Sequence, residues 1–218
     1  QVAASNGTAC VAFFQALESK AGQRLLLNSG DASMGYGLPA AIGMCAANGG
    51  KDTVCLEGDG SIMMNLQELQ TVKTNCLPIK IFIIKNGEYI SIIQTQRNFF
   101  NGRLTGCNRQ SGVEVPDFVK VAQAFGLPAV RIGKNKDVKA GIRRVLAAQG
   151  PVVCELDCSH DYTFAPKLSA RKLPDGTMVS PSLEDMFPFL DRQEMDQIQA
   201  AARQLGEFPH KKYVRKHR

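Results

Sequence analysis

Two short polar motifs hold the residue types that can bind an anion through a metal ion. The first consists of Glu57, Gly58, Asp59, Gly60 and Ser61, between an apolar run and a helical pattern. Its glycines permit a tight turn and a close approach of a ligand, and the amides of Gly60 and Ser61 could receive a phosphate group. Asp59 is a hard oxygen ligand that suits Mg²⁺. Taken alone, the motif is equally well explained by a turn in which Asp59 caps a helix.

A second motif favours the metal-site interpretation because it follows the next apolar run. Residues 79–84 have the pattern of a buried strand, and Asn86 and Glu88 come directly after it. If this strand lies beside the one that precedes Asp59, the two motifs meet at one edge of the sheet. Asn86 then offers a side-chain carbonyl and Glu88 a backbone carbonyl. Together with Asp59, two diphosphate oxygens and a water, these atoms would complete an octahedral Mg²⁺ site.

The elements that must position these motifs alternate between short strands and longer helices. Strand candidates are short runs, rich in Val and Ile, at 24–27, 53–56, 79–84, 129–132 and 152–156. Helix candidates lie at 9–20, 38–47, 65–74, 89–97, 116–125 and 137–148. Several strands are apolar on both faces, as parallel strands covered by helices are. This order predicts an α/β fold with a doubly wound, mostly parallel sheet and helices on both faces.

The chain is expected to have three segments. Residues 1–158 form the α/β domain, residues 159–205 an irregular, Pro-rich C-terminal extension or lid, and residues 206–218 a basic tail. Capping-box patterns that begin at Ser182 and Asp191 predict two short helices in the extension. The apolar side chains between these two caps are expected to dock on another surface. A lid over the site and a structural strap on the domain both remain open.

Charge and cysteine content exclude several classes of function. Five of the last eight residues are Lys or Arg, and the net charge of +6 falls close to neutral without them. The tail is therefore interpreted as solvated, and no nucleic-acid site is expected. The chain has no apolar run long enough for a membrane span. Its seven Cys lack a Cys-x-x-Cys pair, which favours buried, reduced thiols and hence a cytoplasmic protein.

The two motifs resemble the fingerprint of thiamine diphosphate (ThDP) enzymes. Gly58-Asp59-Gly60 is followed, after twenty-four residues, by Lys85-Asn86, and the second half of that fingerprint is usually Asn-Asn. Position 85 departs from the pattern, whereas Asn86 matches the family's metal-binding Asn. The resemblance implies that Asp59 and Asn86 bind Mg²⁺ by their side chains and Glu88 by its carbonyl. It also places Tyr89 and Ile90 among the cofactor contacts.

Two further loops are similar to those of acetolactate synthase and its relatives. In the block at 28–43, the resemblance implies that Met34 wedges between the two cofactor rings, next to Ser33. The carbonyl of Ala32 would accept a hydrogen bond from the aminopyrimidine. Met34 could equally be core filler. The loop Asn6-Gly7-Thr8 would contact the diphosphate, although it could also be an ordinary helix start.

The resemblance covers roughly residues 1–190 and implies an enzyme that decarboxylates 2-oxo acids or joins them to a second carbonyl compound. The cofactor performs that chemistry. The activating Glu of the family belongs to a pyrimidine-binding domain outside this sequence, so no catalytic residue is assigned here. That domain would come from the same or a partner chain, in a homodimer or tetramer. Thr95 stands where acetolactate synthases have Trp, and the substrates and any FAD stay open.

Since the sequence lacks an initiator Met, it is interpreted as part of a longer protein and is expected to be inactive alone. Two alternatives to a fragment of one enzyme remain. The chain could be a separate cofactor-binding subunit, or a non-catalytic assembly module that needs a partner with the pyrimidine-binding domain.

Overall fold

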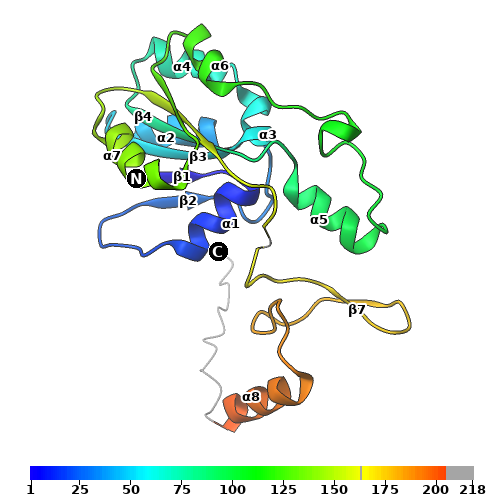
Figure 1. The fold of residues 1–218 in the computed structure, drawn as a ribbon. Coiled ribbons are helices and arrows are strands. Elements are labelled where there is room, and N and C mark those ends of the chain that lie inside the picture. Colours follow the sequence, from blue (N-terminus) through cyan, green and yellow to red (C-terminus); the bar gives the residue numbers. More distant parts are fainter. Residues whose placement is uncertain (163, 205–218) are drawn as a thin grey trace, which may run out of the picture. The chain divides into compact units, whose positions relative to one another are not determined.

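A computed structural model describes residues 1–162 and 164–204 of the chain. It divides into two compact units, Gln1–Tyr162 and Thr163–Arg218 (Figure 1). The basic tail expected at 206–218 lies outside the described residues. The α/β architecture that positions the two polar motifs belongs to the first unit.

The first unit is built on a parallel sheet of six strands in the order β2-β1-β3-β4-β6-β5. The strands are β1 (Val2–Ala4), β2 (Leu25–Leu27), β3 (Thr53–Gly58), β4 (Ile79–Lys85), β5 (Ala129–Ile132) and β6 (Val152–Asp157). The predicted α/β class and parallel sheet are therefore confirmed. Strand β1 is absent from the sequence prediction because only three residues form it, and two of them are Ala, a weak strand former.

Helices cover both faces of this sheet. They are α1 (Gly7–Ala16), α2 (Gly37–Ala47), α3 (Asp59–Ile62), α4 (Glu68–Thr74), α5 (Ile90–Phe99), α6 (Phe118–Ala124) and α7 (Val138–Ala147). Short 3₁₀ turns lie at Met63–Asn65, Arg109–Ser111 and Asn135–Asp137. The helix predicted at 65–74 is shorter in the structure: α4 begins at Glu68 and ends at Thr74, and α3 and a 3₁₀ turn precede it. Helix α1 also ends before the predicted position 20.

Two hydrophobic clusters fill the space between the sheet and its helices. In the larger cluster, Leu38 of α2, Leu69 of α4 and Phe118 of α6 pack with Ile81 of β4. In the smaller cluster, Val145 of α7 packs against the opposite side of the same strands. Because successive side chains of a strand point to opposite faces, β3 and β4 contribute to both clusters, as the apolar pattern predicts.

The strand order creates a switch point between β1 and β3. From β1 the chain proceeds to β2 on one side, whereas β3 and β4 lie on the other side. The loops that follow β1 and β3 therefore lead away in opposite directions and leave a crevice at the carboxyl ends of these strands. Open α/β sheets bind their ligands at such points.

At the other end of the sheet from β1 and β2, a buried carboxylate joins the strands to α6. Glu155 of β6 is fully buried and accepts hydrogen bonds from the Phe118 amide at 2.8 Å and from Arg131 Nε at 2.6 Å. Lys85 Nζ lies 3.3 Å from the same side chain. Arg131 also pairs with Asp117 at 2.9 Å. These contacts compensate the buried charge and tie β4, β5 and β6 to the start of α6.

The second unit contains a short hairpin of β7 (Arg171–Lys172) and β8 (Met178–Val179), followed by α8 (Arg192–Gln204). Asp191 caps α8, because its side chain accepts from the Gln193 amide at 2.9 Å. The helix predicted after Ser182 is wrong, since this stretch forms a turn. Asp185, which would complete the capping box, instead pairs with Arg192 at 2.7 Å.

Leu183 of this stretch is 76% exposed, and Met186 and Leu190 are also exposed. Phe187 and Phe189 are half-buried and pack edge to face against each other. Their expected docking surface, whether as lid or as strap, therefore stays a prediction. Among the described residues, no helix combines the length and the apolar character that a membrane crossing requires. All seven Cys are free, and five of them are buried.

Replacement of Glu155 by Ala should destabilise the first unit. The change leaves the buried Phe118 amide without its acceptor and separates Arg131 and Lys85 from their shared partner. We expect a loss of about 3 kcal/mol in the free energy of unfolding, measured by urea denaturation. Glu114→Ala is the matched control: its side chain is 69% exposed, and its removal should cost less than about 0.5 kcal/mol. Equal stabilities of the two variants would contradict the prediction.

Candidate functional site

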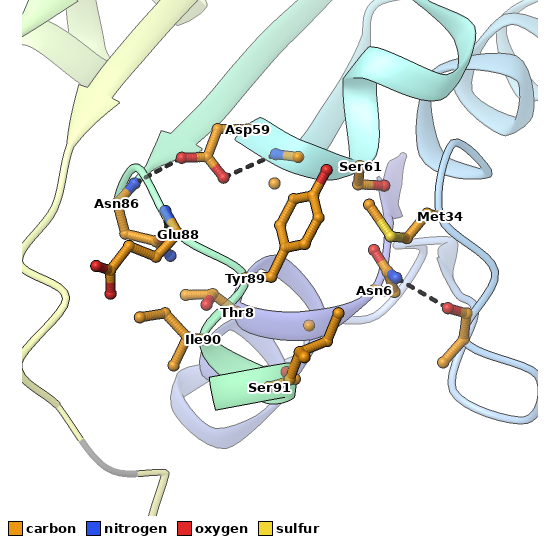
Figure 2. A pocket seen from close by; sticks show the side chains of 15 residues that line it. Asn6, Thr8, Met34, Asp59, Ser61, Asn86, Glu88, Tyr89, Ile90 and Ser91 are labelled. Carbon is orange, nitrogen blue, oxygen red and sulfur yellow. Dashed lines mark hydrogen bonds between the residues drawn. The ribbon is translucent and has the colours of Figure 1, made fainter. Parts of the chain in front are cut away.

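A pocket of about 300 Å³ lies at the switch point, beyond the carboxyl ends of β1, β3 and β4. It is lined by Asn6, Gly7, Thr8, Ala32, Met34, Gly58, Asp59, Gly60, Ser61, Asn86, Glu88, Tyr89, Ile90, Ser91 and Ile92 (Figure 2). All the predicted site residues except Ser33 are in this set. Ser33 is exposed, and its hydroxyl donates to Asp31. The structure thus brings the three predicted loops together, while their roles as cofactor contacts stay predictions.

Asp59 is the most deeply buried acid of the pocket, with 3% of its surface exposed. Its Oδ2 accepts from the backbone N–H groups of Asn86, at 2.9 Å, and Gly87, at 2.7 Å. Its Oδ1 accepts from the backbone N–H of Gly60 at 2.7 Å. Burial raises the pKa of Asp59, although these amides and the charge of Lys85 act against that rise. A cation bound here would stabilise the buried carboxylate.

These bonds show that Asp59 and Asn86 are adjacent, as the metal-site prediction requires. They also alter one detail of that prediction. The Gly60 amide, which the sequence suggests as a phosphate donor, is occupied by the carboxylate of Asp59.

Asn86 has both ends of its side-chain amide in hydrogen bonds. Oδ1 accepts from the Glu88 amide at 3.0 Å, and Nδ2 donates to the Tyr162 hydroxyl at 3.4 Å. The Glu88 side chain points away from the pocket in Figure 2, which leaves its backbone as the part able to bind a ligand. Within the described ranges, no group of three or more His, Cys, Asp and Glu side chains could hold a metal. The predicted site needs only one carboxylate, with an amide and a backbone oxygen.

Position 85, where the sequence departs from the usual Asn-Asn, does not disturb this arrangement. The Lys85 ammonium group pairs with buried Glu155 of the neighbouring strand and is not part of the pocket lining. The departure therefore leaves the oxygen atoms of Asp59 and Asn86 in place.

The Tyr89 ring lies in the middle of the pocket in Figure 2, with Asp59, Ser61 and Met34 around it. It is in close contact with Gly60: a Cβ atom at Gly60 would lie 2.0 Å from Cε1 of the ring. Real side chains cannot approach so closely, so residue 60 must be glycine while the ring keeps this position. The second glycine of the motif therefore makes room for an aromatic side chain of the protein itself.

Buried polar contacts beneath the pocket join the loops that line it. The hydroxyls of Ser5 and Ser61 are 2.8 Å apart, and Ser61 Oγ also accepts from the Gly35 amide at 2.9 Å. Glu57 accepts from the Leu38 amide at 2.8 Å, which fixes the start of α2 to the end of β3. Burial raises the pKa of Glu57. The loops after β1, β2 and β3 are thus held in one arrangement.

The carbonyl of Ala32, the predicted acceptor for the aminopyrimidine, already accepts from Asn6 Nδ2 at 2.8 Å. Ala32 has a φ of 55°. This left-handed backbone conformation is unfavourable for a residue that has a Cβ atom. Such strain is often found where a ligand is bound. A carbonyl has two lone pairs, so the bond from Asn6 leaves room for a second donor.

Two helices of ten residues each, α1 and α5, begin at this pocket. Neither has a side-chain cap at its N-terminus, and their first-turn residues Thr8 and Ser91 line the pocket. Uncapped amides and the positive end of the helix dipole attract anions. The pocket thus combines a buried acid suited to a cation with helix starts suited to a phosphate group.

Together, fold and pocket define an α/β domain with a pocket at the switch point of a parallel sheet, where the groups suit a phosphorylated ligand. Residues 5–156 match the family described as "Thiamine pyrophosphate enzyme, C-terminal TPP binding domain". The chain belongs to this family, as the resemblance of its motifs implies, and the family's ligand is thiamine diphosphate.

Several plant and microbial proteins are similar to the chain over this region. "Acetolactate synthase 2, chloroplastic" of Zea mays is 35% identical over 147 residues, which cover 66% of this chain and 23% of that protein. "Acetolactate synthase large subunit" of Cyanidium caldarium is 42% identical over 133 residues, which cover 61% of this chain and 22% of that protein. The matched region thus spans about a quarter of the length of these relatives.

Sequence reasoning missed two residues that line the pocket and a third that contacts lining residues from outside it. Ser91 and Ile92 line the pocket because they follow Ile90 in the first turn of α5, and the predicted helix start at 89 could have indicated them. Tyr162 contacts Asn86 and Thr8 from beyond the last strand. No local pattern marks it, because only the folded chain brings it to the pocket.

Gly60→Ala tests the contact with the Tyr89 ring. The added Cβ should displace the ring and lower the free energy of unfolding by about 1–3 kcal/mol. In a Tyr89→Ala background the same substitution should cost much less, because the obstructing ring is gone. A double-mutant cycle in urea measures this coupling. An equal cost in both backgrounds would show that the ring is not the reason for glycine.

Proposed function

We propose that this chain binds thiamine diphosphate together with Mg²⁺ as the diphosphate-binding domain of an enzyme that acts on 2-oxo acids. The observation that carries the proposal is the buried Asp59 carboxylate beside Asn86, in a pocket where two helices begin. Family membership and the similarity to acetolactate synthases support the choice of cofactor and reaction class. Decarboxylation and carbon–carbon bond formation both fall within this class.

The described residues fit the magnesium ion and the cofactor. Asp59 and the Asn86 side chain would bind Mg²⁺, with the Glu88 carbonyl as a third oxygen, and hard oxygen ligands favour this ion. The amide groups at the starts of α1 and α5 would receive the diphosphate. Ala32 and Met34, on the loop after β2, would contact the rings. When bound, the cofactor supplies the nucleophilic carbon and the electron sink for the reaction.

The residues of this chain hold and orient the cofactor, and a second domain would complete the site. The rim of the pocket is open: Ile92, which lines it, is 38% exposed. A partner domain that closes the pocket would cover this apolar side chain. That partner would be a pyrimidine-binding domain with the activating Glu, from the same or another chain of a homodimer or tetramer. A separate cofactor-binding subunit, or a non-catalytic assembly module that needs such a partner, is the second candidate.

Acetolactate formation itself is not part of the proposal. Thr95, which takes the place of the Trp of acetolactate synthases, lies on α5 with Ser91 and Ile92. Its hydroxyl donates to the Ser91 carbonyl at 3.0 Å. The donor is assigned only as a 2-oxo acid.

Calorimetry of thiamine diphosphate with the full chain tests the proposal. We expect binding that requires Mg²⁺, and Asp59→Ala should weaken it by more than about tenfold, because the carboxylate ligand is lost. Asp137→Ala, which removes an exposed acid outside the pocket, serves as the control and should bind as the wild-type chain does. Binding by Asp59→Ala at wild-type affinity would refute the metal site.

The purified chain alone should not release CO₂ from pyruvate with thiamine diphosphate and Mg²⁺ present. The expected reason is that the activating Glu lies in another domain. Activity should appear when a chain that carries the pyrimidine-binding domain is added. Steady turnover by the chain alone would contradict this prediction, and binding without activity in every reconstitution would favour the assembly module.

A further inference from the structure

Tyr162 contacts two residues that line the pocket, and the proposed function gives it no role. It lies five positions beyond the end of β6 and is half-buried. Its hydroxyl bonds to the hydroxyl of Thr8 and accepts from Nδ2 of Asn86 at 3.4 Å. One side chain therefore connects the segment after β6 to the start of α1 and to the loop after β4.

The Glu88 backbone N–H orients one end of the Asn86 side-chain amide, and Tyr162 holds the other end. The Glu88 backbone N–H can only donate, so the atom of Asn86 that faces it at 3.0 Å must be the oxygen. Nδ2 then occupies the other end of the amide and donates to the Tyr162 oxygen. A carboxamide held at both ends cannot turn over without losing a hydrogen bond. Oδ1 thus stays on the side of Glu88, whose carbonyl is the third proposed metal ligand.

We propose that Tyr162 is a positioning residue of the magnesium site. Its hydroxyl holds the Asn86 carboxamide in the orientation in which Oδ1 can bind the ion. This rests on the proposed function. Because outer-sphere hydrogen bonds orient the groups that bind a metal, their loss weakens metal binding without removal of a ligand. The bond to Thr8 places the Tyr162 oxygen, since it holds the phenol from the side of α1.

Tyr162→Phe in the full chain removes the hydroxyl and keeps the ring. With thiamine diphosphate at saturation, we expect the apparent affinity for Mg²⁺ to fall about fivefold, as the loss of the hydrogen bond to Asn86 implies. The melting temperature without ligands should stay close to the wild-type value. Tyr36→Phe is the matched control, because Tyr36 precedes α2 and is outside the pocket lining. It should leave the Mg²⁺ affinity unchanged.

A double-mutant cycle with Asn86→Ala separates positioning from a general loss of structure. If Tyr162 acts through the amide, Tyr162→Phe should have no further effect on Mg²⁺ affinity when Asn86 is already Ala. An unchanged Mg²⁺ affinity in Tyr162→Phe would overturn the proposal, whether or not the melting temperature falls. So would an equal effect of Tyr162→Phe in both backgrounds. If the wild-type chain shows no Mg²⁺-dependent binding at all, the proposed function itself fails, and this inference fails with it.

Discussion

A negative charge buried at the end of a β-strand is the constraint on which this site depends. The Asp59 carboxylate has almost no contact with solvent, and backbone amides from its own turn and from the loop after β4 compensate part of its charge. Those amides are in reach because β3 and β4 pair in parallel, with Gly58 opposite Ile84. A shift of this register by one residue would separate Asn86 and Gly87 from the carboxylate. The sheet thus determines where the carboxylate lies, and a bound cation would complete the compensation of its charge.

The sequence contains enough information to place these two motifs but not the contacts around them. Strands β3 and β4 are long and apolar, and each leads directly into a polar motif, so the sequence alone predicts that Asp59 and Asn86 lie together. Strand β1 could not be predicted from the sequence, because a strand of three residues, two of them Ala, has no recognisable apolar pattern. The role of the Gly60 amide also escaped prediction, since it depends on the rotamer of Asp59. Tyr162 reaches the pocket from far along the chain, and only tertiary structure could reveal it.

Local patterns also failed where a side chain had a stronger partner elsewhere. The segment after Ser182 has a capping-box sequence, but Asp185 forms an ion pair with both terminal nitrogens of Arg192, at 2.7 and 3.0 Å. Lys85 shows the opposite case. It departs from the usual metal-binding pattern, but its ammonium group pairs with Glu155 on the neighbouring strand. In both cases, the outcome depends on the partner that the charged side chain contacts in the folded chain, and the local sequence does not show this partner.

The contact between Gly60 and the Tyr89 ring has a consequence for how this domain can diverge. A side chain at position 60 and the present ring at position 89 would occupy the same space. Substitutions at the two positions are therefore coupled. A lineage would have to lose the ring first, and only then could the glycine be replaced without a stability penalty. In an alignment, the residue at position 60 would thus indicate the size of the side chain twenty-nine positions later.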